Sequence, residues 1–119
     1  PATTIGLLST GVLNLNNMRD IESDKLSNKQ TLAGYLGSKQ SKTYHQLLVV
    51  FSMVLIGFYS FLTMNSSMYF LIIAFIPFLV HLNIIRNTIN PKDYDPQLKI
   101  LALSTFFLAI VFSVCHSLI

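Results

Sequence analysis

The sequence NLNNMRDIESDKLSNKQTLAGYLG, from Asn14 to Gly37, is a polar stretch in an otherwise apolar chain. It contains three of the five acidic residues and three of the eight Lys and Arg residues. On both sides of it the chain is rich in Leu, Ile, Val and Phe. A polar stretch between apolar runs indicates that helices carry it to one face of a membrane.

The composition favours a membrane protein over a soluble domain. Hydrophobic residues make up 52% of the 119 residues and charged residues only 11%, whereas a soluble domain has about 25% charged residues. A chain this short cannot hide three long apolar runs in a soluble core. The net charge of +3 does not indicate nucleic-acid binding, because the basic residues lie at the ends of apolar runs. We therefore expect a lipid bilayer around the chain and no nucleic-acid partner.

The apolar runs predict an all-α, polytopic transmembrane helix bundle. Residues 45–64, 68–86 and 100–119 each come close to the roughly 20 residues that a helix needs to cross a bilayer. Residues 1–15 are too few to cross, so we interpret them as the end of a truncated transmembrane helix. Because the chain also begins with Pro1, we expect it to be a piece of a longer protein.

The basic residues predict the orientation of the helices. Residues 16–43 contain five Lys or Arg, residues 86–99 contain three, and the short turn 65–67 contains none. Cytoplasmic loops of membrane proteins carry an excess of Lys and Arg. We therefore expect 16–43 and 87–99 to be cytoplasmic and the C terminus to lie on the opposite side. We interpret 87–99 as a solvated loop, and the alternative is a lid over the polar stretch if that stretch forms an active site.

The polar stretch contains oxygen ligands at helical spacing. If the first helix continues through the stretch, Asn17, Asp20 and Asp24 lie on one face, and so do Asn16, Asp20 and Asp24. Two carboxylates aligned in this way repel each other unless a cation lies between them, and oxygen ligands favour Mg²⁺. Arg19 and Lys29 flank the carboxylates and are suited to binding phosphate oxygens. The spacing alone fits a solvated cytosolic loop equally well.

The motif as a whole is more informative than its two aspartates. The sequences NNMRDIESD at 16–24 and NKQTLA at 28–33, followed by Leu36-Gly37, resemble the second aspartate-rich motif of the UbiA-type membrane prenyltransferases. More narrowly, the Asn-Asn-x-Arg-Asp opening and the Lys-x-Thr-Leu-Ala continuation resemble the branch that prenylates 1,4-dihydroxy-2-naphthoate in menaquinone biosynthesis. The similarity covers about twenty positions of the chain.

The resemblance implies a fold of nine transmembrane helices with two cytoplasmic aspartate-rich motifs that bind a polyprenyl diphosphate through Mg²⁺. This chain would then hold the end of helix six, the second motif, and helices seven to nine. The first motif is not in this chain. The resemblance therefore implies that the N-terminal part of the same protein is a partner, and that the fragment alone is inactive.

The resemblance also assigns roles within the motif. Asp20 and Asp24 match its aspartates and would be catalytic, metal-binding residues, and Asn17 matches a position where other branches have a further Asp. Asn17 would therefore contact the metal and the diphosphate, and Arg19 and Lys29 would contact the diphosphate. Asn28 stands where many members have Gly, a departure that Asn tolerates if it adopts a left-handed turn.

The expected function is the transfer of a polyprenyl group from its diphosphate to an aromatic acceptor in the plasma membrane of a bacterium. The resemblance favours 1,4-dihydroxy-2-naphthoate, but a hydroxybenzoate, haem precursor or chlorophyll precursor is an alternative acceptor. A non-enzymatic transmembrane subunit is an alternative from another class. The histidines lack metal-binding spacing, so we expect His45, His81 and His116 to pack inside the bundle, and lining of the substrate cavity is the alternative for His81.

Overall fold

The computed structural model describes residues 1–63 and 69–117, and within these residues it contains helices and no strand. The prediction of an all-α fold is confirmed. The elements are α1 (Ala2–Arg19), α2 (Ile21–Leu26), α3 (Leu32–Thr63), α4 (Leu71–Asn87), the 3₁₀ helix η2 (Pro91–Tyr94) and α5 (Asp95–Ser117). The predicted spans fall on α3, α4 and α5. The turn predicted at 65–67, and positions 64, 68 and 118–119 at the ends of the spans, lie outside the described residues.

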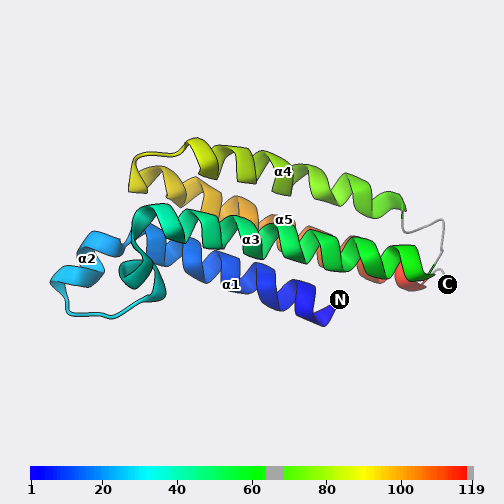
Figure 1. The fold of residues 1–119 in the computed structure, drawn as a ribbon. Helices are drawn as coiled ribbons and strands as arrows, with labels where there is room; N and C mark the ends of the chain where they lie inside the picture. The colour runs from blue at the N-terminus through cyan, green and yellow to red at the C-terminus, as the bar shows by residue number, and fades with distance from the viewer. Residues whose placement is uncertain (64–68, 118–119) are drawn as a thin grey trace.

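The long helices α1, α3, α4 and α5 run side by side along one axis of an elongated molecule of 52 × 21 × 19 Å (Figure 1). Helix α2 and the connection between α4 and α5 lie at the same end of the bundle. The N terminus lies toward the opposite end, as does the end of α5. The structure thus brings the two charged regions, 16–43 and 86–99, to one end, as a shared cytoplasmic side requires.

Much of the outer surface of the bundle is apolar. Helix α3 and the segment from η2 through α5 are each long and apolar enough to cross a membrane, and α4 is a shorter apolar helix. Large side chains that are more than half exposed include Phe51, Phe58, Phe61, Ile73 and Phe106. Exposure on this scale is unfavourable in water, whereas lipid or further apolar helices can cover it.

Two local breaks shape the chain around the polar stretch. Helix α1 ends at Arg19, and Asp20, with φ of −99° and ψ of 9°, separates it from α2. The condition under which the oxygen ligands share one helical face, a helix that continues through this stretch, is therefore not met. Helix α3 is interrupted at Gly37, where φ of 75° and ψ of 170° form a combination that is open almost only to glycine.

A compact apolar cluster lies beneath the polar stretch and connects it to the bundle. Its buried members come from α1, α2, the start of α3, α4 and η2: Leu15, Met18, Ile21, Ala33, Ile85 and Tyr94. A second, larger cluster continues the core along the bundle and includes Leu8, Val49, Phe78, Leu101 and Leu108. Burying these side chains together holds α2 and η2 against the same end of the bundle.

Candidate functional site

Asp24 and Lys29 form an ion pair at the end of α2. Asp24 is buried, and Lys29 Nζ lies 3.1 Å from its Oδ1. The helix ends in a Schellman motif: Lys29 N–H donates to the Asp24 carbonyl, and Asn28 N–H donates to the Lys25 carbonyl. This motif needs a left-handed residue, and Asn28 has φ of 57°. The left-handed turn predicted at Asn28 is confirmed.

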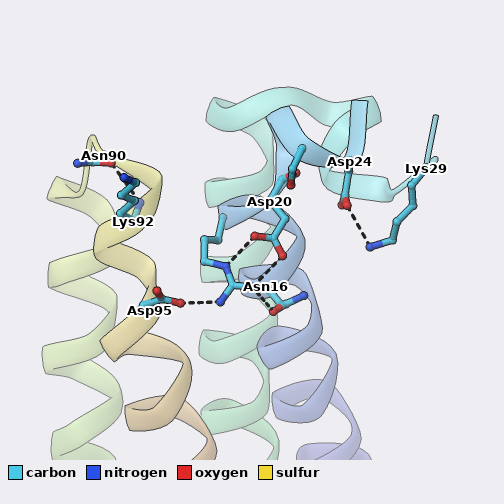
Figure 2. A network of polar contacts seen from close by, with 9 residues as sticks. Asn16, Asp20, Asp24, Lys29, Asn90, Lys92 and Asp95 are labelled. Carbon is cyan, nitrogen blue, oxygen red and sulfur yellow. Dashed lines mark hydrogen bonds and ion pairs between the residues drawn. The ribbon is translucent and has the colours of Figure 1, made fainter. Parts of the chain in front are cut away.

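Arg19 lies at the centre of a second network at the end of α1 (Figure 2). Its Nε donates to Asp20 Oδ1 at 2.7 Å and its Nη2 to Asp20 Oδ2 at 2.8 Å, so the guanidinium binds both carboxylate oxygens in a bidentate contact. Nη2 also donates to Asn16 Oδ1 at 3.0 Å. Nη1 donates to Asp95 Oδ1 at 2.5 Å, although Asp95 follows 76 residues later in the chain.

These contacts decide the charge states in the network. The hydrogen bonds from Arg19 hold the pKa of the Asp20 carboxyl below its usual value, against a smaller opposing effect of burial. Bonds to Asp20 and then Asp95 raise the pKa of the Arg19 guanidinium further above neutrality. At neutral pH the network therefore consists of one cation between two carboxylates.

The structure places the predicted site residues in two separate pairs. Asp20 is bound by Arg19 and Asp24 by Lys29, so each carboxylate has its own cationic partner (Figure 2). Asn17 is half-buried, and within residues 1–63 and 69–117 its side chain forms no hydrogen bond. The basic residues thus lie beside the carboxylates, as predicted, but contact them directly.

The side chains present fit part of a Mg²⁺ site. Asp24 Oδ2 is buried and has no hydrogen-bond partner in the described part of the chain, so it is an acceptor that a cation or donor can satisfy. A carboxylate has about four lone-pair positions, so Asp20 can still accept contacts beyond those from Arg19. The described residues contain no group of three His, Cys, Asp or Glu side chains placed to hold a metal. Further ligands must therefore come from water, a phosphate or another segment.

Sequence reasoning missed Asp95 as a member of the site, and it considered Asn16 as an oxygen ligand but not as a partner of Arg19. The expectation of a loop over 87–99 is wrong from Pro91 onward, because η2 spans Pro91–Tyr94 and α5 begins at Asp95. The Asp95 side chain is nevertheless largely exposed. The signal that could have found it was the charge count, which already placed 86–99 on the same side as 16–43. Asn16 lies three residues before Arg19, a spacing at which helical side chains meet.

A hollow of about 330 Å³ lies beside the Asp24–Lys29 pair, and more of its lining surface is apolar than polar. It is lined by Lys25, Asn28, Lys29, Gln30, Thr31, Gly34 and Tyr35. Two of these residues are cationic. The Thr31 hydroxyl accepts the N–H of Gly34 and so caps the start of α3. The hollow therefore places two lysine side chains beside the first residues of α3.

His45 and His81 lie inside the bundle, as predicted, whereas His116 is exposed, so the prediction is wrong for His116. His45 Nε2 is 2.9 Å from His81 Nε2, and His81 Nδ1 is 2.8 Å from Gln97 Oε1. All three side chains are buried, so this network joins α3, α4 and α5. The histidine ring of His45 packs against Gly11 of α1. The network is thus separate from the carboxylate pairs.

Comparison with known proteins agrees with the geometry. Residues 1–111 match the UbiA prenyltransferase family. The chain is 35% identical over 100 residues to a 1,4-dihydroxy-2-naphthoate octaprenyltransferase of Escherichia coli, covering 83% of this chain and 32% of that protein. It is 32% identical over 114 residues to the protein of the same name in Haemophilus influenzae, covering 95% of this chain and 37% of that protein. It is 44% identical over 54 residues to the protein of the same name in Mycobacterium leprae, covering 45% of this chain and 18% of that protein.

The chain therefore spans about a third of the length of the first two of these relatives. No solved structure matches the chain with significance.

Proposed function

The chain belongs to the UbiA prenyltransferase family, and we propose that it is part of an integral membrane enzyme that transfers a polyprenyl group to 1,4-dihydroxy-2-naphthoate. The donor would be a polyprenyl diphosphate, and the product would enter menaquinone biosynthesis. The names of the relatives support the acceptor. The apolar surface of α3, α4 and α5 supports a location in the bilayer.

One observation carries the proposal most directly. The residues that the motif assigns to diphosphate and metal, Asp20, Asp24 and Lys29, lie at one end of a bundle whose sides are apolar. A polyprenyl diphosphate has the same division into a charged head and a long hydrocarbon chain. An enzyme for it needs a charged site at the boundary of the bilayer and an apolar surface below.

We assign the roles of the residues as follows. Lys29 would contact the diphosphate as a point charge, because it lines the hollow beside the Asp24–Lys29 pair and its side chain is about half exposed. Asp20, Asp24 and Asn17 would hold Mg²⁺ together with the N-terminal part of the same protein. When bound, Mg²⁺ would neutralise the charge that develops on the leaving diphosphate. The acceptor ring would then attack the allylic carbon and lose its carboxylate.

Arg19 has a more restricted role than the motif alone suggests. A guanidinium has five N–H donors, and in the described structure those of Nε and Nη2 and one of Nη1 are engaged. One N–H of Nη1 remains for a ligand. Arg19 would therefore give the diphosphate one hydrogen bond while it holds Asp20.

We also propose that the charged end faces the cytoplasm of a bacterium and that the chain lies in its plasma membrane. The excess of Lys and Arg at this end supports the orientation. The C terminus would then lie on the opposite side of the membrane. This orientation exposes the charged site to water-soluble Mg²⁺ and to the diphosphate group.

The test uses the full-length protein in membranes with Asp20→Asn, Asp24→Asn and the control Glu22→Gln. Glu22 lies in the same motif but is exposed and makes only a long contact of 3.7 Å with Lys25. We expect either Asp substitution to lower Mg²⁺-dependent prenyl transfer by roughly 100-fold or more, with membrane insertion unchanged. Glu22→Gln should keep nearly full activity. Normal turnover by both Asp variants would show that the catalytic assignment is wrong.

The same membranes distinguish the alternatives. Incubation with 1,4-dihydroxy-2-naphthoate, a hydroxybenzoate, and haem and chlorophyll precursors identifies the acceptor from the product formed. Transfer to one of the other acceptors would overturn the naphthoate assignment but keep the reaction type. No transfer to any of them by the wild-type protein would favour a non-enzymatic transmembrane subunit.

A further inference from the structure

Asp95 and the carboxylate motif are connected through a single guanidinium. Arg19 reaches Asp20 with Nε and Nη2, and it reaches Asp95 with Nη1 (Figure 2). The two carboxylates thus hold one cation from different elements, the end of α1 and the start of α5. A substitution at Asp95 should therefore change the orientation of the Asp20 carboxylate, although the two carboxylates are not bonded to each other.

The segment before Asp95 is built to hold its position. Asn90 accepts the backbone N–H of Lys92 with its side chain, and the N–H of Asp93 donates to its carbonyl. Pro91 starts the 3₁₀ turn with a fixed φ. Tyr94 is only 2% exposed and lies in the apolar cluster beneath the motif. Asp95 follows this buried anchor directly, so its carboxylate is presented from a fixed backbone.

Arg19 without Asp95 has greater freedom. Its remaining contacts, to Asp20 and Asn16, all lie on its own segment, within three residues. Such local contacts can move together with the end of α1. The hydrogen bond to Asp95 fixes the position of the Arg19 guanidinium relative to α5. Through Arg19 it also fixes the Asp20 carboxylate.

We infer that Asp95 is a positioning residue for the aspartate motif, holding Arg19 so that the Asp20 carboxylate keeps one orientation toward Mg²⁺ and diphosphate. This inference rests on the proposed function. It assigns a task to the connection between α4 and α5 that the motif does not contain. Outer partners of metal ligands commonly change metal affinity 10-fold to 100-fold, and Asp95 acts one step further from the metal. We therefore expect a smaller change, roughly threefold to tenfold.

The test compares Asp95→Asn, Asp95→Glu and Asp93→Asn in the full-length protein in detergent. Asp93 is the matched control, because it lies in the same turn, is exposed, and forms no ion pair in the described residues. The first measurement is the rise in melting temperature on adding inorganic diphosphate at increasing Mg²⁺ concentration. It reports binding without turnover. The second is the Mg²⁺ concentration for half-maximal prenyl transfer, together with the KM for the aromatic acceptor.

We expect Asp95→Asn to raise both half-saturating Mg²⁺ concentrations about threefold or more and to leave the KM for the acceptor unchanged. Asp95→Glu keeps the negative charge and should bring both half-saturating Mg²⁺ concentrations close to the wild-type values. This result separates a positioning role from misfolding. Asp93→Asn should match the wild type. Equal behaviour of Asp95→Asn and Asp93→Asn would overturn the inference. So would tighter diphosphate binding by Asp95→Asn, because Asp95 would then compete with the ligand for Arg19.

The outcomes also separate this inference from the proposed function. If the wild-type protein shows no Mg²⁺-dependent stabilisation by diphosphate, both are overturned. If the wild type binds diphosphate and transfers the prenyl group but Asp95→Asn does the same at equal Mg²⁺, only the role of Asp95 is lost. If the wild type binds Mg²⁺ and diphosphate without transferring a prenyl group, the proposed function fails while the binding titration still decides the role of Asp95.

Discussion

Lys29 Nζ lies 3.1 Å from Asp24 Oδ1 because the left-handed Asn28 turns the chain back over the last turn of α2. The same turn places the Lys29 N–H on the Asp24 carbonyl, 2.9 Å away. Lys29 is therefore joined to Asp24 twice, through backbone and side chain. The left-handed conformation of Asn28 thus positions the basic side chain of Lys29 beside the Asp24 carboxylate.

The first prediction concerns the conformation of Asn28. Asn28→Ala should lower the free energy of unfolding by about 1 kcal/mol, because alanine is strained at positive φ. Asn28→Gly should change it by only a few tenths, since glycine adopts this conformation freely. Denaturation of the full-length protein in detergent measures the difference, and exchange of the Lys29 amide with deuterium reports the turn itself. Equal stability of the two variants would contradict the left-handed turn.

The second prediction compares two lysines of the motif. Lys29→Gln should destabilise the protein by about 1 kcal/mol, because it removes the partner of the buried Asp24 carboxylate. The second oxygen of this carboxylate already lacks a hydrogen-bond partner among the described residues. The cost stays below that of a fully buried pair because Lys29 is about half exposed. Lys25→Gln removes only an exposed contact of 3.7 Å and should cost less than about 0.5 kcal/mol. Thermal denaturation in detergent measures the two losses of stability. A larger loss in Lys25→Gln than in Lys29→Gln would refute the prediction.

The third prediction concerns pH. Because Arg19 lowers the pKa of the Asp20 carboxyl in the folded state, the ionised form of Asp20 stabilises the fold. This contribution is complete above the unfolded pKa of about 3.9 and is lost as pH falls through the lower folded value. The difference in stability between wild type and Asp20→Asn should therefore be constant near neutrality and shrink below about pH 4.

Arg19→Gln provides the matching control for this pH dependence. It should return the pKa of Asp20 toward its ordinary value, because the hydrogen bonds from Arg19 are the largest cause of the shift. A carboxyl carbon NMR titration of Asp20 in both proteins measures this directly. An unchanged Asp20 titration in Arg19→Gln would show that the ion pair is not formed in solution.

The fourth prediction concerns the buried network of His45, His81 and Gln97. Gln97→Leu should destabilise the bundle by about 1–2 kcal/mol, because it leaves His81 Nδ1 buried without its partner. Replacing all three residues by apolar residues of similar size should cost less than this single change, since no polar atom then remains unpaired. Gln46→Leu is the control, because the Gln46 side chain is only half-buried and forms no hydrogen bond in the described residues. A triple variant less stable than Gln97→Leu would contradict this reading.

Several features of the site were predictable from neighbouring residues. The left-handed Asn28 followed from its replacement of a glycine within the motif, and the backbone conformation of one residue depends mainly on its own side chain. The basic residues beside the carboxylates followed from the same short stretch. The break at Asp20 was missed, because the alignment of Asn17, Asp20 and Asp24 favoured an uninterrupted helix and no Gly or Pro marks the turn.

The helical class, the apolar surface and the charged end of this protein follow from hydropathy and charge along contiguous residues. Which distant side chains meet depends instead on how the helices pack. Arg19 bonds to Asp95 across 76 residues, and His45 meets His81 across 36. Such pairs depend on how the helices pack and rotate against one another, and many packings satisfy the same apolar pattern. The motif therefore predicted most of the residues of the site, whereas it did not predict that the site is bonded to α5 through Asp95.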